Sequence, residues 1–240
     1  MQYWSAVDIL KQLSAELGIP QQTTVVNSGN VQGSQLLAHL NSSGNELQLY
    51  YPWSQFQKTW EWTSVAGQDN YDLPADWRYF IDQTQWDKTN RWPLMGPKSP
   101  QEWQWLKNGI VATFPRTRYR VIGSKFYILP TPAVGSLFSF AMEYISGNWV
   151  SSAGTPRNMI TTDGDICQYD PWLLIKFAKM KWLNTKNLDP NGVATSEFTR
   201  VFESLTGKDV GAPVLSLTPI QTPMYIGPQS VPDGSWQVGP

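Results

Sequence analysis

The sequence predicts an α+β protein: a helical bundle built from N- and C-terminal helices, with an inserted β-rich domain and an extended C-terminal arm. Three observations predict this class. Apolar residues near both ends of the chain recur at spacings of three and four, which is typical of amphipathic helices. In the middle of the chain they alternate with polar residues, which is typical of strands. The last 33 of the 240 residues hold six of the 18 prolines and only three charged residues.

Two helices are predicted within residues 1–56. The first has an apolar stripe and is ended by Gly18 and Pro20. That stripe consists of Tyr3, Ala6, Leu10, Leu13 and Leu17. The second is expected from Gln35 to Tyr51, with Leu36, Leu40, Leu47 and Tyr51 on one face. Gly44 continues this face, which indicates either the close approach of a neighbouring backbone or a simple break in the helix.

Residues 57–165 are expected to form the β-rich insertion. Trp60 and Trp62 share one face of a first strand, and Gly123-Ser124 suits a hairpin turn between strands 116–122 and 125–129. A further strand has Phe138, Phe140, Met142 and Tyr144 on one face. A short helix at 100–108 is predicted inside the insertion, because Ser99 and Glu102 form a capping box around Pro100.

Residues 166–207 are predicted to form a C-terminal α-hairpin. Asp170-Pro171 and Asp189-Pro190 each combine a capping acid with proline at the first helical position. The second helix would place Ala194, Phe198, Val201 and Leu205 on one stripe before Gly207. Residues 208–240 are expected to be an extended, proline-rich arm.

The composition excludes several classes of function. A single cysteine, Cys167, allows no internal disulfide or thiolate cluster, and a single histidine, His39, allows no zinc site with two or three histidines. A net charge of −1 gives no basic surface for tight DNA binding. Asp8 interrupts any signal peptide, and no apolar run is long enough for a membrane span, so a soluble chain is expected. We expect no catalytic residue, cofactor or metal.

The charged fraction of 15% is low and the aromatic fraction of 13% is high, which indicates surface hidden from water. Five tryptophans lie in one window: Trp77, Trp86, Trp92, Trp103 and Trp105. They could form an exposed sugar platform, but core or subunit contacts are favoured. Asp163 and Asp165 are interpreted as a capped turn rather than a calcium loop, while His39 and Cys167 are interpreted as structural.

Arg116, Arg118 and Arg120 alternate along one predicted strand, so they share a face opposite Thr117 and Tyr119. Such a row could bind phosphate or an acidic partner, because the planar guanidinium group of arginine can form two parallel hydrogen bonds to either phosphate or carboxylate. A solvated face or a row of salt bridges between subunits is favoured, since no basic excess surrounds it. The three arginines are therefore candidates for a channel or an intersubunit surface.

Several motifs resemble those of the head-to-tail adaptor, or connector, proteins of tailed bacteriophages of the podovirus type. They comprise Leu73-Pro74-Ala75-Asp76-Trp77, then Ile81, Thr84, Trp86 and Asp87, then Gly96-Pro97, Ser99-Pro100 and Glu102-Trp103, and finally Glu143-Tyr144-Ile145-Ser146 with Trp149. The resemblance extends over roughly residues 3–206. One departure is the segment Lys186 to Pro190, where the family often has a different turn.

The resemblance implies a structural virion protein and not an enzyme. Such adaptors form a homo-oligomeric ring, commonly of twelve copies, which joins the portal protein to the tail tube or nozzle protein and continues the DNA channel. DNA would pass through without sequence-specific binding, and no membrane is involved. The implied location is the head-tail interface of the virion, after synthesis in the host bacterial cytoplasm.

The arm is expected to dock on the portal or on a neighbouring subunit, because its apolar residues cannot be covered locally. The candidate contact residues are Val214, Leu215, Leu217, Ile220, Tyr225, Ile226 and Trp236. The competing hypothesis is a carbohydrate-binding or glycan-cleaving tail component, which the tryptophan density would also suit. A subunit of another virion ring is a third interpretation.

Overall fold

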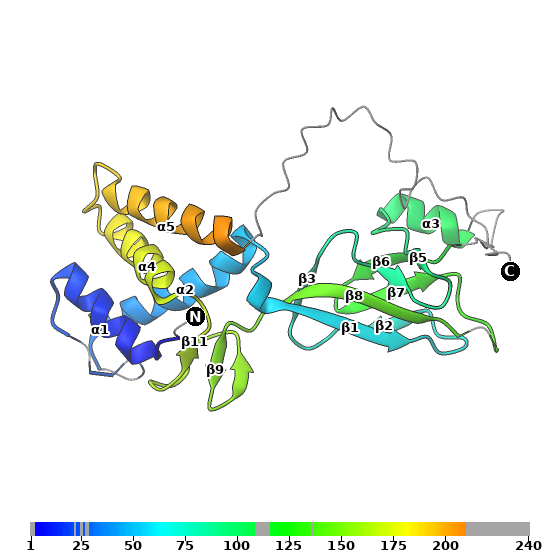
Figure 1. Ribbon diagram of the computed structural model, residues 1–240, viewed down its shortest axis with the longest axis horizontal. Coiled ribbons are helices and arrows are strands. Elements are labelled where there is room, and N and C mark those ends of the chain that lie inside the picture. The colour runs from blue at the N-terminus through cyan, green and yellow to red at the C-terminus, as the bar shows by residue number, and fades with distance from the viewer. Residues whose placement is uncertain are drawn as a thin grey trace, which may run out of the picture. The chain divides into compact units, whose positions relative to one another are not determined.

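A computed structural model describes residues 3–21, 23–24, 26, 29–108, 116–135 and 137–209. These residues fall into two compact units. The helical unit contains the residues up to Gln57 and those from Ile145 onward, and the β-rich unit contains Lys58–Tyr144 (Figure 1). Helices from both ends of the chain thus meet in one unit, which confirms the predicted α+β class.

The helical unit contains α1 (Ala6–Leu17), α2 (Val31–Tyr50), the 3₁₀ turn η1 (Ser54–Phe56), β9 (Val150–Ser152), β10 (Thr155–Arg157), β11 (Ile166–Cys167), α4 (Pro171–Thr185) and α5 (Val193–Asp209). α4 packs against α1, α2 and α5 (Figure 1). In the antiparallel sheet β10-β9-β11, β9 and β10 fall inside the range 57–165 expected for the insertion, but the sheet groups with the helices.

Helix α1 begins and ends where its capping residues predict. The Ser5 hydroxyl accepts a hydrogen bond from the Asp8 amide, and Gly18 adopts the left-handed conformation, at φ 66°, that ends the helix. Ala6, Leu10 and Leu13 are buried as predicted. Tyr3 was wrongly predicted to continue this stripe: it precedes the helix and is 46% exposed, because the cap at Ser5 turns the chain.

Helix α2 begins at Val31, four residues before the predicted Gln35, because Asn30 accepts a hydrogen bond from the Gln32 amide and caps it. It runs through Gly44 without a break and ends at Tyr50, so Tyr51 lies outside it. An added Cβ at Gly44 would lie 2.4 Å from the Trp149 indole. Glycine is thus needed at this position because a neighbouring side chain, rather than a neighbouring backbone, approaches the helix closely.

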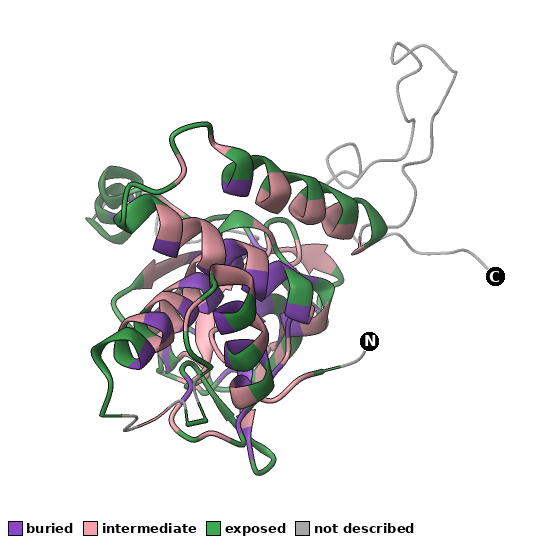
Figure 2. Cartoon of the chain, turned by 90° about the vertical axis from the view of Figure 1, so that its left-hand side faces the viewer, coloured by how far each residue is buried: buried purple, intermediate pink, exposed green. Residues whose placement is uncertain are grey.

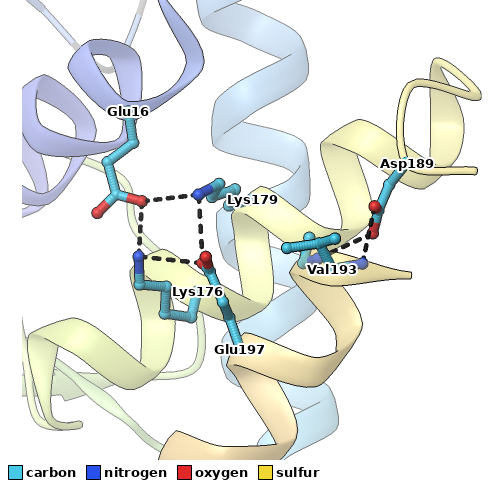
Figure 3. Close-up of polar contacts among 7 residues, drawn as sticks. Glu16, Lys176, Lys179, Asp189, Val193 and Glu197 are labelled. Atoms are coloured by element: carbon cyan, nitrogen blue, oxygen red, sulfur yellow. Dashed lines mark hydrogen bonds and ion pairs between the residues drawn. The ribbon is translucent and has the colours of Figure 1, made fainter. Parts of the chain in front are cut away.

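The two C-terminal helices differ in how their acids cap them. Asp170 accepts hydrogen bonds from Trp172 and Leu173, so Pro171 is the first residue of α4 as predicted. The equivalent prediction for Pro190 is wrong, because α5 begins at Val193. The Asp189 carboxylate accepts hydrogen bonds from the amides of Val193 and Ala194, which follow it by four and five residues (Figure 3). The intervening Gly192 has φ 66°, which is incompatible with a helix starting at Pro190.

Helix α5 buries its stripe only partly. Ala194 is buried, whereas Phe198, Val201, Phe202 and Leu205 are half-buried. Figure 2 shows α5 as the uppermost helix, with partly covered residues on the side facing the unit and exposed residues on the other. The helix runs to Asp209 rather than ending at Gly207, so Lys208 and Asp209 are helical and not part of an extended arm.

A square of four charges joins α1, α4 and α5 (Figure 3). Glu16 lies 2.9 Å from Lys176 and 3.3 Å from Lys179, and Glu197 lies 3.3 Å from each of the same two ammonium groups. Glu16 and both lysines are at most 20% exposed at their side chains. Hydrogen bonding to Lys179 is the main cause that lowers the pKa of Glu197, so this carboxylate stays ionised at neutral pH.

The elements of the β-rich unit are β1 (Gln57–Thr63), β2 (Asn70–Asp72), β3 (Trp77–Phe80), β4 (Trp86–Asp87), β5 (Trp92–Pro93), α3 (Pro100–Asn108), β6 (Arg118–Ile122), β7 (Lys125–Leu129) and β8 (Ser139–Ser146). The first residue of β1 and the last two residues of β8 group with the helical unit. One sheet has the order β1-β8-β4-β5, with β3 also paired to β8, and the other has the order β2-β7-β6. Their buried residues form one core: Tyr71, Leu94, Tyr119, Phe126, Ile128, Phe140 and Met142.

The predicted local features of this unit are confirmed. Gly123 has φ 60° in the turn that joins β6 to β7. The Ser99 hydroxyl accepts a hydrogen bond from the Glu102 amide at the start of α3, as a capping box requires. Trp60 and Trp62 stack on each other, with ring centroids 5.5 Å apart, and pack against the core. Phe140, Met142 and Tyr144 are buried on one face of β8.

Candidate assembly surfaces

The contact residues predicted for the arm lie outside the described residues. They are Val214, Leu215, Leu217, Ile220, Tyr225, Ile226 and Trp236. Their role as a partner interface therefore stays a prediction. The described chain ends on α5, where the Asp209 carboxylate accepts hydrogen bonds from the amide and hydroxyl of Ser54, at 3.0 and 2.5 Å. The C-terminal end of α5 is thus tied to the turn that follows α2.

The three arginines of the predicted row lie on one face of the β2-β7-β6 sheet. Arg118 and Arg120 belong to β6 and Arg116 precedes it, and all three are half-buried, while Thr117 and Tyr119 are buried on the opposite face. Arg118 pairs with Leu129, and Arg120 pairs with Tyr127. Because paired residues share a face, a leucine and a tyrosine of β7 lie beside these two cations.

Helix α3 packs close to this face of the sheet. The Lys107 ammonium lies 5.9 Å from the ring centroid of Trp103 and 5.8 Å from that of Tyr127, the residue paired with Arg120. A hydrogen bond from Lys98 is the main cause that lowers the pKa of Glu102, and the charge of Arg118 adds to it. Glu102 and the rest of α3 therefore flank the arginine row, so the row is not a fully exposed line of cations.

Arg116 differs from the other two arginines because its side chain borders a cavity in the β-rich unit. The cavity is also lined by Trp86 and Met95, and one guanidinium nitrogen of Arg116 lies 4.0 Å from the Met95 sulfur. Arg118 and Arg120 are not among the described residues that line it. The structure therefore divides the predicted row into two environments.

The five clustered tryptophans do not form one exposed platform. Trp103 is 2% exposed, and Trp77 and Trp92 are half-buried. Only Trp86 and Trp105, at 37% and 61%, are exposed. A sugar shelf built from all five rings is therefore inconsistent with the structure, because stacking on a sugar needs open ring faces.

An aromatic patch on the helical unit is absent from the sequence predictions. We call Tyr3, Trp4 and Trp172 the N-terminal aromatic patch. The rings of Trp4 and Trp172 lie 6.0 Å apart, and Tyr3 and Trp172 are each 46% exposed. Tyr3 and Trp4 also line a shallow cavity of about 430 Å³ together with Asp8. Exposed aromatic groups of this kind favour contact with other proteins.

The remaining candidates have structural roles. Asp165 is fully buried and accepts hydrogen bonds from Thr161 and Thr162, and its backbone carbonyl accepts one from the Ala6 amide at 2.7 Å. The interpretation of this turn as a capping element is thus confirmed. Burial raises the pKa of the Cys167 thiol to about 12. Among the described residues, no group of histidine, cysteine and acidic side chains could hold a metal ion.

His39 lies half-buried on α2 against Trp182, with ring centroids 6.0 Å apart. Burial lowers its pKa, and the nearby charges of Lys181 and Lys186 lower it further. The imidazole is therefore neutral at physiological pH, as expected for a structural histidine. No helix in the described part of the chain combines the length and apolar character of a membrane-crossing segment.

A half-covered helix and an exposed aromatic patch are features of a structural subunit that packs against other proteins. Comparison with protein families agrees with this class. The chain belongs to the SU10 adaptor protein family, whose model matches residues 5–213. It is therefore a bacteriophage adaptor protein, as the resemblance of its motifs implies. A comparison with curated proteins found no match.

Proposed function

We propose that this adaptor forms a homo-oligomeric ring, of twelve copies, that joins the portal protein to the tail tube or nozzle protein of the virion and continues the DNA channel. The observation that carries the proposal is the family match over residues 5–213, because it spans both units of the chain. The chain would be synthesised in the host bacterial cytoplasm and act as a structural component rather than as an enzyme.

The chemistry of the described surface supports an assembled state. The N-terminal aromatic patch and the partly covered stripe of α5 leave apolar area that contact with a neighbouring copy or with the portal would cover. A ring contact is heterologous, so two different surfaces of one subunit must meet. The aromatic patch, on the α1 and α4 side, is one candidate for such a surface.

The charge of the chain supports passage of DNA rather than its retention. The net charge is −1, and the arginine row lies beside a leucine and a tyrosine of β7 and is flanked by α3. A wall with few exposed cations makes few phosphate contacts and so holds DNA weakly. DNA would thus slide through the ring without sequence-specific binding.

A direct experiment is negative-stain imaging of the portal from the same virion, alone and after mixing with the full chain. The proposal predicts an extra ring-shaped tier on one end of the portal. Portal particles of unchanged outline at saturating adaptor concentration would contradict it.

The arm is proposed to dock on the portal or on a neighbour. A chain truncated after Asp209 keeps all of α5 and its contact with Ser54, so it should fold like the full chain. We expect it to bind the portal at least tenfold more weakly, because the apolar residues from Val214 to Trp236 are lost. Surface-immobilised portal measures both affinities, and circular dichroism checks the fold. Equal affinities of the truncated and full chains for the portal would show that the arm does not contribute to portal binding.

A further inference from the structure

The cavity beside Arg116 lies wholly within the β-rich unit. Its volume is about 440 Å³, which is within the range of ligand-binding pockets. Its wall is built from the segment that leads into β4 and the first residue of that strand, the segment from Pro93 to Gly96, and Arg116, two residues before β6. No role for these residues follows from the adaptor assembly proposed above.

The walls of the cavity are held in place by backbone hydrogen bonds. The Leu94 amide donates to the Gln85 carbonyl at 3.0 Å, and the Met95 amide donates to the Thr117 carbonyl at 3.0 Å. Gly96 is packed so tightly that an added Cβ would lie 2.6 Å from the Tyr119 carbonyl oxygen. The cavity is therefore preformed, which lowers the entropic cost of filling it.

The lining combines one cation with apolar surface. Arg116 is the charged group, Gln83 and Gln85 add two amide side chains, and Trp86, Pro93, Leu94 and Met95 supply apolar area. Trp86 and Met95 are 37% and 39% exposed, so a ligand could reach them from solvent. An arginine fork binds a carboxylate strongly, and the ring and thioether beside it favour an apolar group.

We propose that this cavity binds a segment of a partner protein in which a carboxylate lies next to an apolar side chain. The carboxylate contacts Arg116, and the apolar group packs on Trp86 and Met95. A phosphate or a nucleic acid backbone matches this site less well, because most of the wall is apolar. The proposal concerns the β-rich unit alone and does not depend on ring formation.

The methyl group of Met95 offers a local reporter. The full chain is labelled with ¹³C at its methionine methyl groups, and the Met95 resonance is assigned with the variant Met95→Leu. N-acetylphenylalanine, which carries a carboxylate and an apolar ring, is the probe, and N-acetylphenylalaninamide is the matched uncharged probe. We expect a saturable shift of the Met95 resonance with the acid and at least tenfold weaker binding of the amide.

Variants separate the cavity from the rest of the arginine row. Arg116→Gln should weaken binding of the acid at least tenfold, while Arg120→Gln, on the same face but outside the cavity, should leave it unchanged. The other methionine resonances check that each variant is folded. The comparison of the acid with the amide uses the unaltered chain, so it stays valid even if a variant fails to fold. Equal binding of both probes, no shift with either, or undiminished binding to Arg116→Gln would overturn the proposal. A larger affinity for diacetylchitobiose would make the cavity a sugar site instead.

Discussion

Replacing Asp165 by asparagine is expected to lower the free energy of unfolding by about 3 kcal/mol at pH 7, because charge-assisted hydrogen bonds to a buried carboxylate are lost. The amides of Thr161 and Thr162 donate to one carboxylate oxygen at 2.7 and 2.9 Å, and the Thr162 hydroxyl donates to the other. An asparagine NH₂ group placed against these donors cannot accept from them. Urea denaturation followed by circular dichroism measures the change.

The same substitution has a predicted pH dependence. Burial alone would raise the pKa of Asp165, but hydrogen bonds from Thr162, Thr161 and Ser152 outweigh it and hold the pKa well below its ordinary value. A lowered folded pKa gives stability that is present above the ordinary carboxyl pKa and is lost as the pH falls through the folded one. The unfolding free energies of the two proteins should therefore converge as the pH is lowered from about 5.

Asp163→Asn is the matched control for Asp165→Asn. Asp163 lies in the same turn but is half-buried, and its side chain accepts from the Val26 amide at 3.0 Å. Its replacement should cost clearly less than that of Asp165, because its carboxylate is only half-buried and water can replace lost hydrogen bonds. Equal losses at the two positions, or a loss at Asp165 that stays constant down to pH 3, would contradict the role given to the buried carboxylate.

Replacing Gly44 by alanine is expected to destabilise the chain by about 1–3 kcal/mol, the cost of overpacking a core. An added Cβ would lie 2.4 Å from two atoms of the Trp149 indole, and Trp149 is fully buried. The carbonyl of Gly44 also accepts a hydrogen bond from the Tyr169 hydroxyl at 3.1 Å, so the backbone has little freedom to retreat. Thermal and urea denaturation both measure this loss.

Gly207→Ala tests the same change without the steric conflict. Gly207 is exposed near the end of α5, and a Cβ there would meet nothing within 4 Å. Because alanine has the higher helix propensity, this variant should be stabilised by up to about 1 kcal/mol. Opposite signs at the two glycines are the expected result, and destabilisation of similar size at both would show that packing against Trp149 is not the cause.

The features that the sequence predicts well are local. The cap at Ser99, the turn at Gly123 and the burial alternation of β8 each depend on a few neighbouring residues, and all are present. The start of α5 was misplaced because a second acid-proline pair looks the same as the first. Only the tertiary structure reveals that Asp189 caps from farther away, across Gly192.

The candidate surfaces were less predictable because they depend on segments far apart in the chain. The alternation of the three arginines is visible in the sequence, but the approach of α3 and the separate environment of Arg116 are not. The N-terminal aromatic patch arises because Trp4 meets Trp172, the second residue of α4. Likewise, the close contact of Trp149 explains Gly44, for which the sequence left two interpretations open.

The proposed ring is tested most directly by mass photometry of the chain alone, of its portal alone, and of the two together. Assembly of twelve copies on the portal predicts a discrete complex whose mass exceeds that of the portal by twelve chains of 27.2 kDa each. A different fixed number of added chains would correct the stoichiometry and keep the ring. A chain that stays monomeric in both the presence and the absence of portal would contradict the proposed function.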